Sequence, residues 1–189
     1  MIELIYPEGP APVLSGARIS RASEMLPVVD PNGYVTGQVS REQCHREGKL
    51  LHPVVHLEII DRFSRLYLQH RSPQKKSWPG CWDSAVGGHV SYGEKVIEAL
   101  FREAGEELGL FDFNPHFIKS YIYEGAEERE LVNLFAAVGS YDLHPDNHEV
   151  TEGRLWTMEE IEASLGTGVF TPNFEYEFRL AKDELTALL

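Results

Sequence analysis

Three glutamates, Glu103, Glu106 and Glu107, are spaced so that they would share one face of a helix. Residues at positions i, i+3 and i+4 are neighbours on a helix surface, so this spacing brings three carboxylates together. Their repulsion costs about 0.2–0.5 kcal/mol per pair, and a hard dication such as Mg²⁺ would offset it. The other interpretation is a solvated acidic face in which Arg102 and Glu106 form an i,i+4 ion pair.

An amphipathic helix from residue 93 to residue 108 is expected to carry these glutamates. Its apolar residues repeat at helical spacing and form one stripe: Val96, Ile97, Leu100, Ala104 and Leu108. Gly109 is the expected stop. Since the stripe would face a core, the carboxylates are predicted on a firmly anchored helix.

The rest of the sequence predicts a middle region made mainly of strands, with helices between and after these strands. An Asn32-Gly33 hairpin is expected, and Ser40 with Gln43 predicts a short helix that ends at Gly48. Strands are expected at 26–30, 34–37, 53–60, 65–70, 82–88, 116–123, 131–138 and 153–156.

Two late helices complete the expected elements. Thr157 with Glu160 predicts the start of one and Gly166 its end, and Thr171-Pro172 predicts the start of the last. The whole pattern is typical of an α+β fold in which helices sandwich a mixed sheet. Residues 1–24 are interpreted as an N-terminal extension, and residues 25–185 as a single domain.

The composition excludes several functional classes. The 189 residues include 17 basic and 30 acidic side chains, for a net charge of −13. Such a surface repels nucleic acid and anionic membranes. Two cysteines make no disulfide framework, the N-terminus lacks the features of a signal peptide, and no apolar run could span a bilayer. A cytoplasmic location is expected.

Residues 88–110 resemble the Nudix box, G-x5-E-x7-R-E-U-x-E-E-x-G-U with U aliphatic. Ala104 stands where a bulkier aliphatic residue is usual. Eight positions fall in register: Gly88, Glu94, Arg102, Glu103, Glu106, Glu107, Gly109 and Leu110. A match of this length is far more specific than a lone glycine motif.

The resemblance implies a Nudix-type α/β/α sandwich with a mixed β-sheet and hydrolysis of a diphosphate linkage. Glu103, Glu106 and Glu107 would bind Mg²⁺ or Mn²⁺. Arg102 would pair with Glu94, and Gly88 would let the backbone approach the phosphates. The catalytic base stays open, with Glu149 and Glu152 as candidates or as ordinary loop residues. Many members of the family dimerise, and a homodimer is the corresponding expectation.

Residues 75–89, KKSWPGCWDSAVGGH, are similar to a stretch of bacterial isopentenyl diphosphate isomerase, a Nudix relative that performs no hydrolysis. That resemblance implies a second site for Zn²⁺ or Mn²⁺. Its ligands would be His45, His52, His89, Glu128 and Glu130. Alternatively, each histidine is a surface or packing residue.

The isomerase pattern is broken at Gly87, where that enzyme carries its reactive cysteine, and Ser84 and Ala85 do not reproduce its loop polarity. Glu103 and Glu106, which the isomerase has lost, are kept here. The sequence therefore favours metal-dependent hydrolysis of a small-molecule diphosphate, most simply a nucleoside diphosphate derivative. An isopentenyl diphosphate isomerase and a non-catalytic diphosphate-binding module are the alternatives.

Side chains that select the substrate are expected on loops. Arg71, Lys75 and Lys76 are candidates for phosphate contacts, with a solvated turn as the alternative. Four aromatic residues are candidates for stacking on a base, with core packing as the alternative: Trp78, Trp82, Tyr92 and Phe101.

Overall fold

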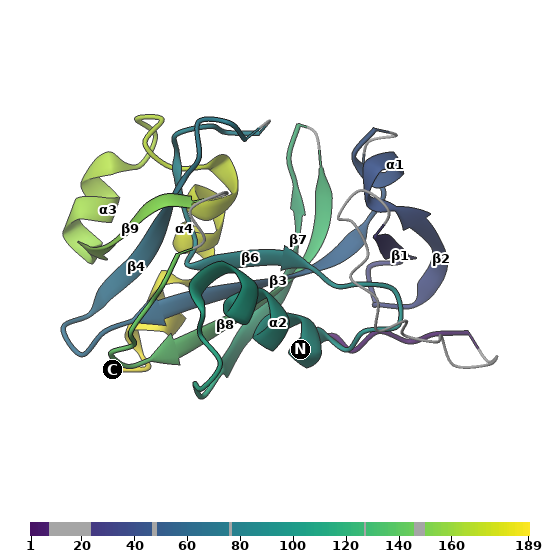
Figure 1. Cartoon of the computed structure of the whole chain (residues 1–189), viewed down its shortest axis with the longest axis horizontal. Helices are drawn as coiled ribbons and strands as arrows, with labels where there is room; N and C mark the ends of the chain where they lie inside the picture. Colours follow the sequence, from purple (N-terminus) through teal and green to yellow (C-terminus); the bar gives the residue numbers. More distant parts are fainter. Residues whose placement is uncertain (8–23, 47–48, 76, 127, 146–149) are drawn as a thin grey trace.

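A computed structural model describes residues 1–7, 24–46, 49–75, 77–126, 128–145 and 150–189, except for the side chains of residues 45 and 46 (Figure 1). Its main sheet has seven strands. The central strand β3 (His52–Ile60) pairs in parallel with β8 (Arg129–Val138) and antiparallel with β6 (Val86–His89) and β4 (Arg65–Arg71). The sheet is therefore mixed, as expected.

Three further strands extend this sheet. Strand β7 (His116–Glu124) pairs with β8, while β5 (Trp82–Asp83) and β9 (Val150–Thr157) pair with β4. Every residue of β3 is buried, because helices cover both faces of the sheet at this strand. A strand buried on both faces reads as a largely apolar run, and β3 does so except at His52, His56 and Glu58.

Helices α2 (Val96–Leu108) and α4 (Pro172–Thr186) lie on opposite faces (Figure 1). One core joins alternate residues of β3 to α2: Val55, Leu57, Ile59, Leu100, Ala104 and Leu108. The other joins the end of β3 and β4 to α4: Ile60, Leu66, Leu68, Phe174, Phe178 and Ala181. The expected α/β/α sandwich is confirmed.

The predicted hairpin and the predicted start of the short helix after Ser40 are confirmed. Strands β1 (Met25–Val29) and β2 (Val35–Ser40) form a separate two-stranded sheet, and Gly33 in its turn has φ of +87°. Helix α1 (Arg41–Arg46) follows, with the Gln43 amide donating to Ser40 Oγ at 3.2 Å. The expected stop, Gly48, lies outside the described residues.

Helix α3 (Met158–Ser164) begins with the expected reciprocal cap between Thr157 and Glu160. Its C-terminal cap is Leu165, one residue before the predicted Gly166. Helix α4 begins as predicted, with Thr171 as its N-terminal cap and Pro172 in its first turn.

Two of the differences from the predicted element boundaries have a clear physical cause. The single strand expected at 82–88 is two strands, because β5 pairs with β4 whereas β6 pairs with β3. The helix expected from residue 93 begins at Val96. Gly93 has φ of +88°, and the Glu94 carboxylate accepts from the Ser91 amide in the loop and from Arg102 two turns into the helix. Glycine and a side chain engaged elsewhere both oppose an earlier start.

Residues 1–7 pack on the domain that follows. The Ile2 amide donates to Asn133 Oδ1 at 3.1 Å, and Ile5 forms a parallel bridge with Tyr34. The boundary at residue 24 stays a prediction. Within the described ranges, none of the helices combines the length and apolar character that a membrane span requires.

Candidate catalytic site

Helix α2 carries the glutamates on the side next to β6. Its apolar stripe is buried against the sheet, and Gly109 ends it in the left-handed conformation with φ of +64°. Ile97 is only partly buried, whereas Val96, Leu100, Ala104 and Leu108 are fully inside. Because that face is fixed in the core, the positions of Glu103 and Glu107 are fixed as well.

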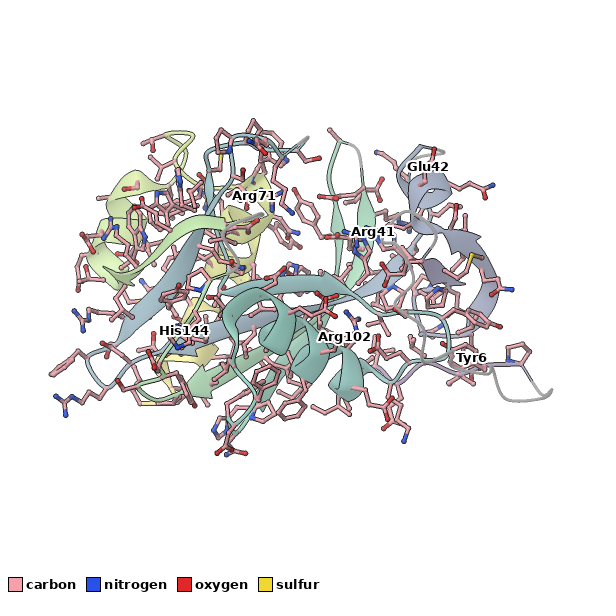
Figure 2. The ribbon with its side chains drawn as sticks, viewed as in Figure 1. Tyr6, Arg41, Glu42, Arg71, Arg102 and His144 are labelled. Carbon is pink, nitrogen blue, oxygen red and sulfur yellow. The ribbon has the colours of Figure 1, made fainter. Side chains whose placement is uncertain are left out.

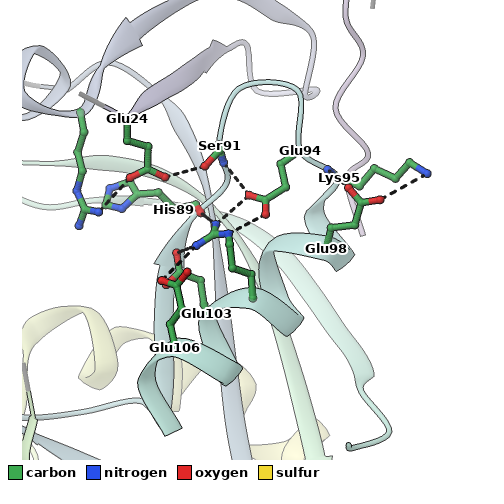
Figure 3. Close-up of polar contacts among 10 residues, drawn as sticks. Glu24, His89, Ser91, Glu94, Lys95, Glu98, Glu103 and Glu106 are labelled. Carbon is green, nitrogen blue, oxygen red and sulfur yellow. Dashed lines mark hydrogen bonds and ion pairs between the residues drawn. The ribbon is translucent and has the colours of Figure 1, made fainter. Parts of the chain in front are cut away.

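Arg102 ties this helix to the loop that precedes it (Figures 2 and 3). It forms a bidentate ion pair with Glu94, with Nε–Oε1 and Nη2–Oε2 both at 2.8 Å. The same guanidinium donates to the His89 carbonyl at 2.9 Å and to Glu103 Oε1 at 2.7 Å. Burial alone would lower the pKa of Arg102, but its bonds with Glu94 and Glu103 raise it. The structure therefore places Arg102 and Glu94 together as the resemblance implies.

Glu103 lies directly over Gly88. A Cβ atom added at Gly88 would sit 2.0 Å from Glu103 Cδ, so any larger residue there would displace the carboxylate. The Glu103 side chain is buried, and burial raises its pKa, as does the charge of Glu106, against the opposing effect of Arg102. Gly88 thus makes room for a carboxylate.

Glu107 contacts β4 and the residue of β6 that precedes Gly88. Its Oε2 accepts from Gln69 Nε2 at 2.8 Å and from the Gly87 amide at 3.4 Å. Burial, with the charge of Glu103, raises the pKa of Glu107 to about 7, although the two hydrogen bonds and Lys75 oppose the shift. Glu103 and Glu107 are thus close enough to repel each other.

The three carboxylates are not arranged as a complete set of metal ligands. Within the described part of the chain, no three His, Cys, Asp or Glu side chains are placed so that they could hold a metal ion. Arg102 binds Glu103 and lies 3.8 Å from Glu106, so the i,i+4 ion pair of the alternative interpretation is present.

The chemistry of the donors nevertheless fits Mg²⁺ or Mn²⁺. All the side chains that α2 offers are carboxylates, which are the ligands these cations prefer. Burial and mutual repulsion raise the pKa values of Glu103 and Glu107 by more than Arg102 and Lys75 lower them. A dication at these oxygens would compete with Arg102 for Glu103.

Part of the second predicted cluster comes together on the α4 side of the sheet. His52 is the cross-strand partner of Glu130, and its ring stacks on that of His89 with centroids 5.2 Å apart. Burial and the charge of Glu128 raise the pKa of Glu130 to about 8, and Glu130 accepts from Asn173 at 3.0 Å. The side chain of His45 lies outside those described.

His52 is also held by its own neighbours. Its Nδ1 is 2.8 Å from the Leu50 carbonyl and 3.3 Å from Cys44 Sγ. Here too, the described residues contain no three His, Cys, Asp or Glu side chains placed to hold a metal ion. A second metal site therefore stays a prediction.

Among the other candidates, Lys75 lies close enough to α2 for its charge to act on the pKa of Glu107, whereas Arg71 does not lie at this site. Figure 2 shows Arg71 well away from Arg102; it pairs with Asp83 at 3.0 Å and donates to the Ser77 carbonyl. Glu152 is exposed on β9 and opposite His70. Lys76 and Glu149 lie outside the described residues.

The aromatic candidates divide between core and surface. Trp82 packs against Trp156, and Phe101 packs against Phe113. Tyr92 packs edge-on against Tyr6, whereas Trp78 is exposed.

A buried polar network is absent from the sequence prediction. His56 and Glu58 of β3, Ser84, Tyr121 of β7 and Glu177 of α4 are linked around the Glu177 carboxylate. Its signal in the sequence is the pair of polar residues two apart in the apolar run of β3, which share one face of the strand.

The fold and the glutamate helix define a family. The sequence profile of the NUDIX domain matches residues 50–174, and the chain belongs to the Nudix family. It is 31% identical to an uncharacterized Nudix hydrolase of Streptomyces coelicolor over 157 residues, which cover 82% of this chain and 86% of that protein.

Another relative carries a different name. The chain is 30% identical to the isopentenyl-diphosphate Delta-isomerase of Brevibacterium linens over 148 residues, which cover 75% of this chain and 81% of that enzyme. A solved structure from Deinococcus radiodurans has a TM-score of 0.73 at 23% identity and covers 84% of this chain and 99% of its own. That similarity supports the fold.

Proposed function

We propose that this protein is a metal-dependent hydrolase that cleaves the diphosphate linkage of a small metabolite such as a nucleoside diphosphate derivative. The observation that carries the proposal is the pair Glu103 and Glu107, two neighbouring carboxylates whose pKa values are raised on a helix that the Nudix box anchors. Negative charge concentrated in this way is suited to a cation, and a cation is suited to a diphosphate.

Glu103, Glu106 and Glu107 are the residues that would hold Mg²⁺ or Mn²⁺. Such an ion neutralises phosphate charge, orients a water molecule and lowers the pKa of that water. The protein supplies position: Glu94 fixes Arg102, and Arg102 fixes both the His89 carbonyl and Glu103. Gln69 and the Gly87 amide fix Glu107 from the sheet.

Isomerisation of isopentenyl diphosphate is the second candidate, because several curated relatives carry that name. It requires an acid or base at carbon, and Gly87 supplies none. Cys81 Sγ donates to the Gly168 carbonyl at 3.7 Å, and burial and the charge of Asp83 raise the pKa of its thiol. A thiol in that state is a poor substitute, so hydrolysis is favoured.

The test is a screen of diphosphates with Mg²⁺ or Mn²⁺. The panel contains nucleoside diphosphates, ADP-ribose, a nucleotide sugar, thiamine diphosphate and isopentenyl diphosphate, with released phosphate, pyrophosphate or nucleotide measured. Wild type is compared with Glu103→Gln and Glu107→Gln. Glu159→Gln, an exposed position on α3, is the matched control.

Hydrolysis that is lost in both site variants and kept in the control supports the proposal. Interconversion of isopentenyl and dimethylallyl diphosphates without hydrolysis would replace it with the isomerase function. Binding of a diphosphate without turnover of any compound would indicate a non-catalytic binding module.

A further inference from the structure

A buried ion pair lies on the α4 side of the sheet, between His56 of β3 and Glu177 of α4. His56 Nδ1 is 2.7 Å from Glu177 Oε2, and Glu177 is completely buried. Tyr121 donates to the same oxygen at 2.5 Å, and Ser84 donates to the other at 3.2 Å. A carboxylate held in this way fixes both the orientation of the imidazole and the nitrogen that faces away from it, Nε2.

The charges around His56 favour an imidazolium. Burial alone would lower its pKa, but Glu177, with smaller effects of Glu130 and Asp83, raises it to about 9. The other carboxyl group of this network, Glu58, has its pKa raised by burial and by Glu177, which favours its neutral form. Nε2 is therefore an N–H donor at neutral pH.

The Nε2 edge of the ring lies beside Gly87. His56 and Gly87 are cross-strand partners in β3 and β6, so they face the same side of the sheet. A Cβ atom at Gly87 would lie 3.5 Å from His56 Cδ2 and 3.6 Å from Nε2, and Gly87 itself is exposed. The missing side chain therefore leaves the imidazole edge open to a molecule that lies over Gly87.

Gly87 also contacts the proposed catalytic helix. Its amide donates to Glu107 Oε2 at 3.4 Å, so one exposed residue joins the carboxylates of α2 to the imidazole on the α4 side. A diphosphate held near Glu107 that extends across Gly87 would meet His56 next.

We propose that His56 is a substrate-binding residue whose Nε2–H donates a hydrogen bond to a phosphate oxygen of the diphosphate lying over Gly87. Glu177 is the positioning residue that orients His56. This inference rests on the proposed hydrolysis of a diphosphate. A charged donor matches an anionic oxygen, and such bonds are stronger than neutral ones. A purely structural ion pair would need neither the exposed glycine nor the nearby Glu107.

The sharpest test is Gly87→Ala, which places a methyl group at ordinary van der Waals distance from His56 and covers Nε2. The probe is methylenediphosphonate, a diphosphate that cannot be hydrolysed, titrated calorimetrically in the presence of Mn²⁺. We expect its dissociation constant to rise about 10- to 100-fold while the melting temperature stays unchanged. Gly37→Ala, an exposed strand position with no atom within 4 Å of the added Cβ, is the matched control.

The second test is His56→Gln, with the exposed His116→Gln as its control. The readout is the NMR signals of the His56 imidazole, which are assigned by their loss in the variant. Mg²⁺ takes the place of Mn²⁺ in this experiment. In wild type, these signals are expected to shift when methylenediphosphonate is added. His56→Gln is expected to weaken probe binding by the same factor as Gly87→Ala. If His56→Gln does not fold, Gly87→Ala decides the matter alone.

Binding within twofold of wild type in Gly87→Ala, or His56 signals that ignore the probe, would overturn this inference. If Glu107→Gln abolishes binding in the same series, the proposed hydrolase function survives that result. If wild type neither binds the probe nor hydrolyses any diphosphate, both proposals fail together.

Discussion

Gly88 determines where Glu103 can lie, because the carboxylate occupies the space in which a side chain would stand. We predict that Gly88→Ala displaces Glu103 and lowers kcat/KM for the best substrate of the screen about 100-fold, as expected for a misplacement of about 1 Å. Steady-state kinetics with Mg²⁺ measures this change. Gly37→Ala is again the control, and a Gly88→Ala enzyme with kcat/KM within twofold of wild type would contradict the prediction.

Glu107 makes stability depend on pH in an unusual direction. Its pKa is raised to about 7, so the folded protein binds this proton more tightly than the unfolded chain does. Ionisation of Glu107 therefore removes stability as the pH rises from its ordinary pKa to about 7. Glu107, a proposed cation ligand, therefore lowers the free energy of unfolding at neutral pH when the cation is absent.

We predict that Glu107→Gln is more stable than wild type in EDTA, because the amide keeps an oxygen for Gln69 and the Gly87 amide without the buried charge. The gain in the free energy of unfolding should grow by about 1–2 kcal/mol between about pH 5.5 and about pH 8. Urea denaturation at both pH values measures it. A gain that does not depend on pH would show that Glu107 titrates normally.

The junction of α2 with the loop before it is held by the side chain of Arg102. Arg102 makes three separate contacts there, with Glu94, Glu103 and the His89 carbonyl. Lysine can keep the charge but not the fork geometry. We predict that Arg102→Lys lowers the free energy of unfolding by about 1–3 kcal/mol.

Thermal and urea denaturation check this prediction, with Arg179→Lys as the matched control. Arg179 is itself exposed and forms a single i,i+4 ion pair with the partly buried Glu175 on α4, so its replacement by lysine should change stability by less than about 0.5 kcal/mol. Equal losses of unfolding free energy in the two variants would mean that the bidentate geometry of Arg102 contributes nothing to stability.

The elements that could be predicted from the sequence are those set by local signals. The Asn32-Gly33 turn, the Thr157 cap and the stripe of α2 depend on residues a few positions apart, and each is confirmed. The break between β5 and β6 was missed, because it depends on which strand each half pairs with.

The site divides in the same way. The Glu94–Arg102 pair is implied by the resemblance to the Nudix box, and the structure contains it. The pairing of His56 with Glu177 spans 121 residues and could not be read from either segment alone. The sequence also predicted three glutamates free to bind a cation, whereas in the structure Glu103 is bound to Arg102. Helical periodicity shows which residues share a face, but it does not show which partner a carboxylate binds.

At the scale of the whole molecule, we expect the net charge of −13 and the acidic cluster on α2 to make the stability sensitive to divalent cations. We predict that Mg²⁺ or Mn²⁺ raises the melting temperature relative to EDTA, with a stabilisation of about 2.7 kcal/mol at about 100 times the dissociation constant. The double variant Glu103→Gln, Glu107→Gln should lose this response.

The same experiment tests the second predicted metal site. Zn²⁺ or Mn²⁺ bound at His52, His89 and Glu130 would add a stabilisation that His52→Ala removes and the double glutamate variant keeps. A His52→Ala protein whose response to every cation equals that of wild type would eliminate that site.

Residues before β3 are hydrogen-bonded to the loop that leads into α2. The Gly93 amide donates to the Tyr6 hydroxyl at 2.6 Å, the Tyr92 amide donates to the Met25 carbonyl at 2.7 Å, and Ser91 donates to Glu24 at 2.7 Å. The family profile begins only at residue 50. A protein trimmed to that span would lose these three acceptors at once, so a shortened version that keeps the loop in place needs Tyr6, Glu24 and Met25.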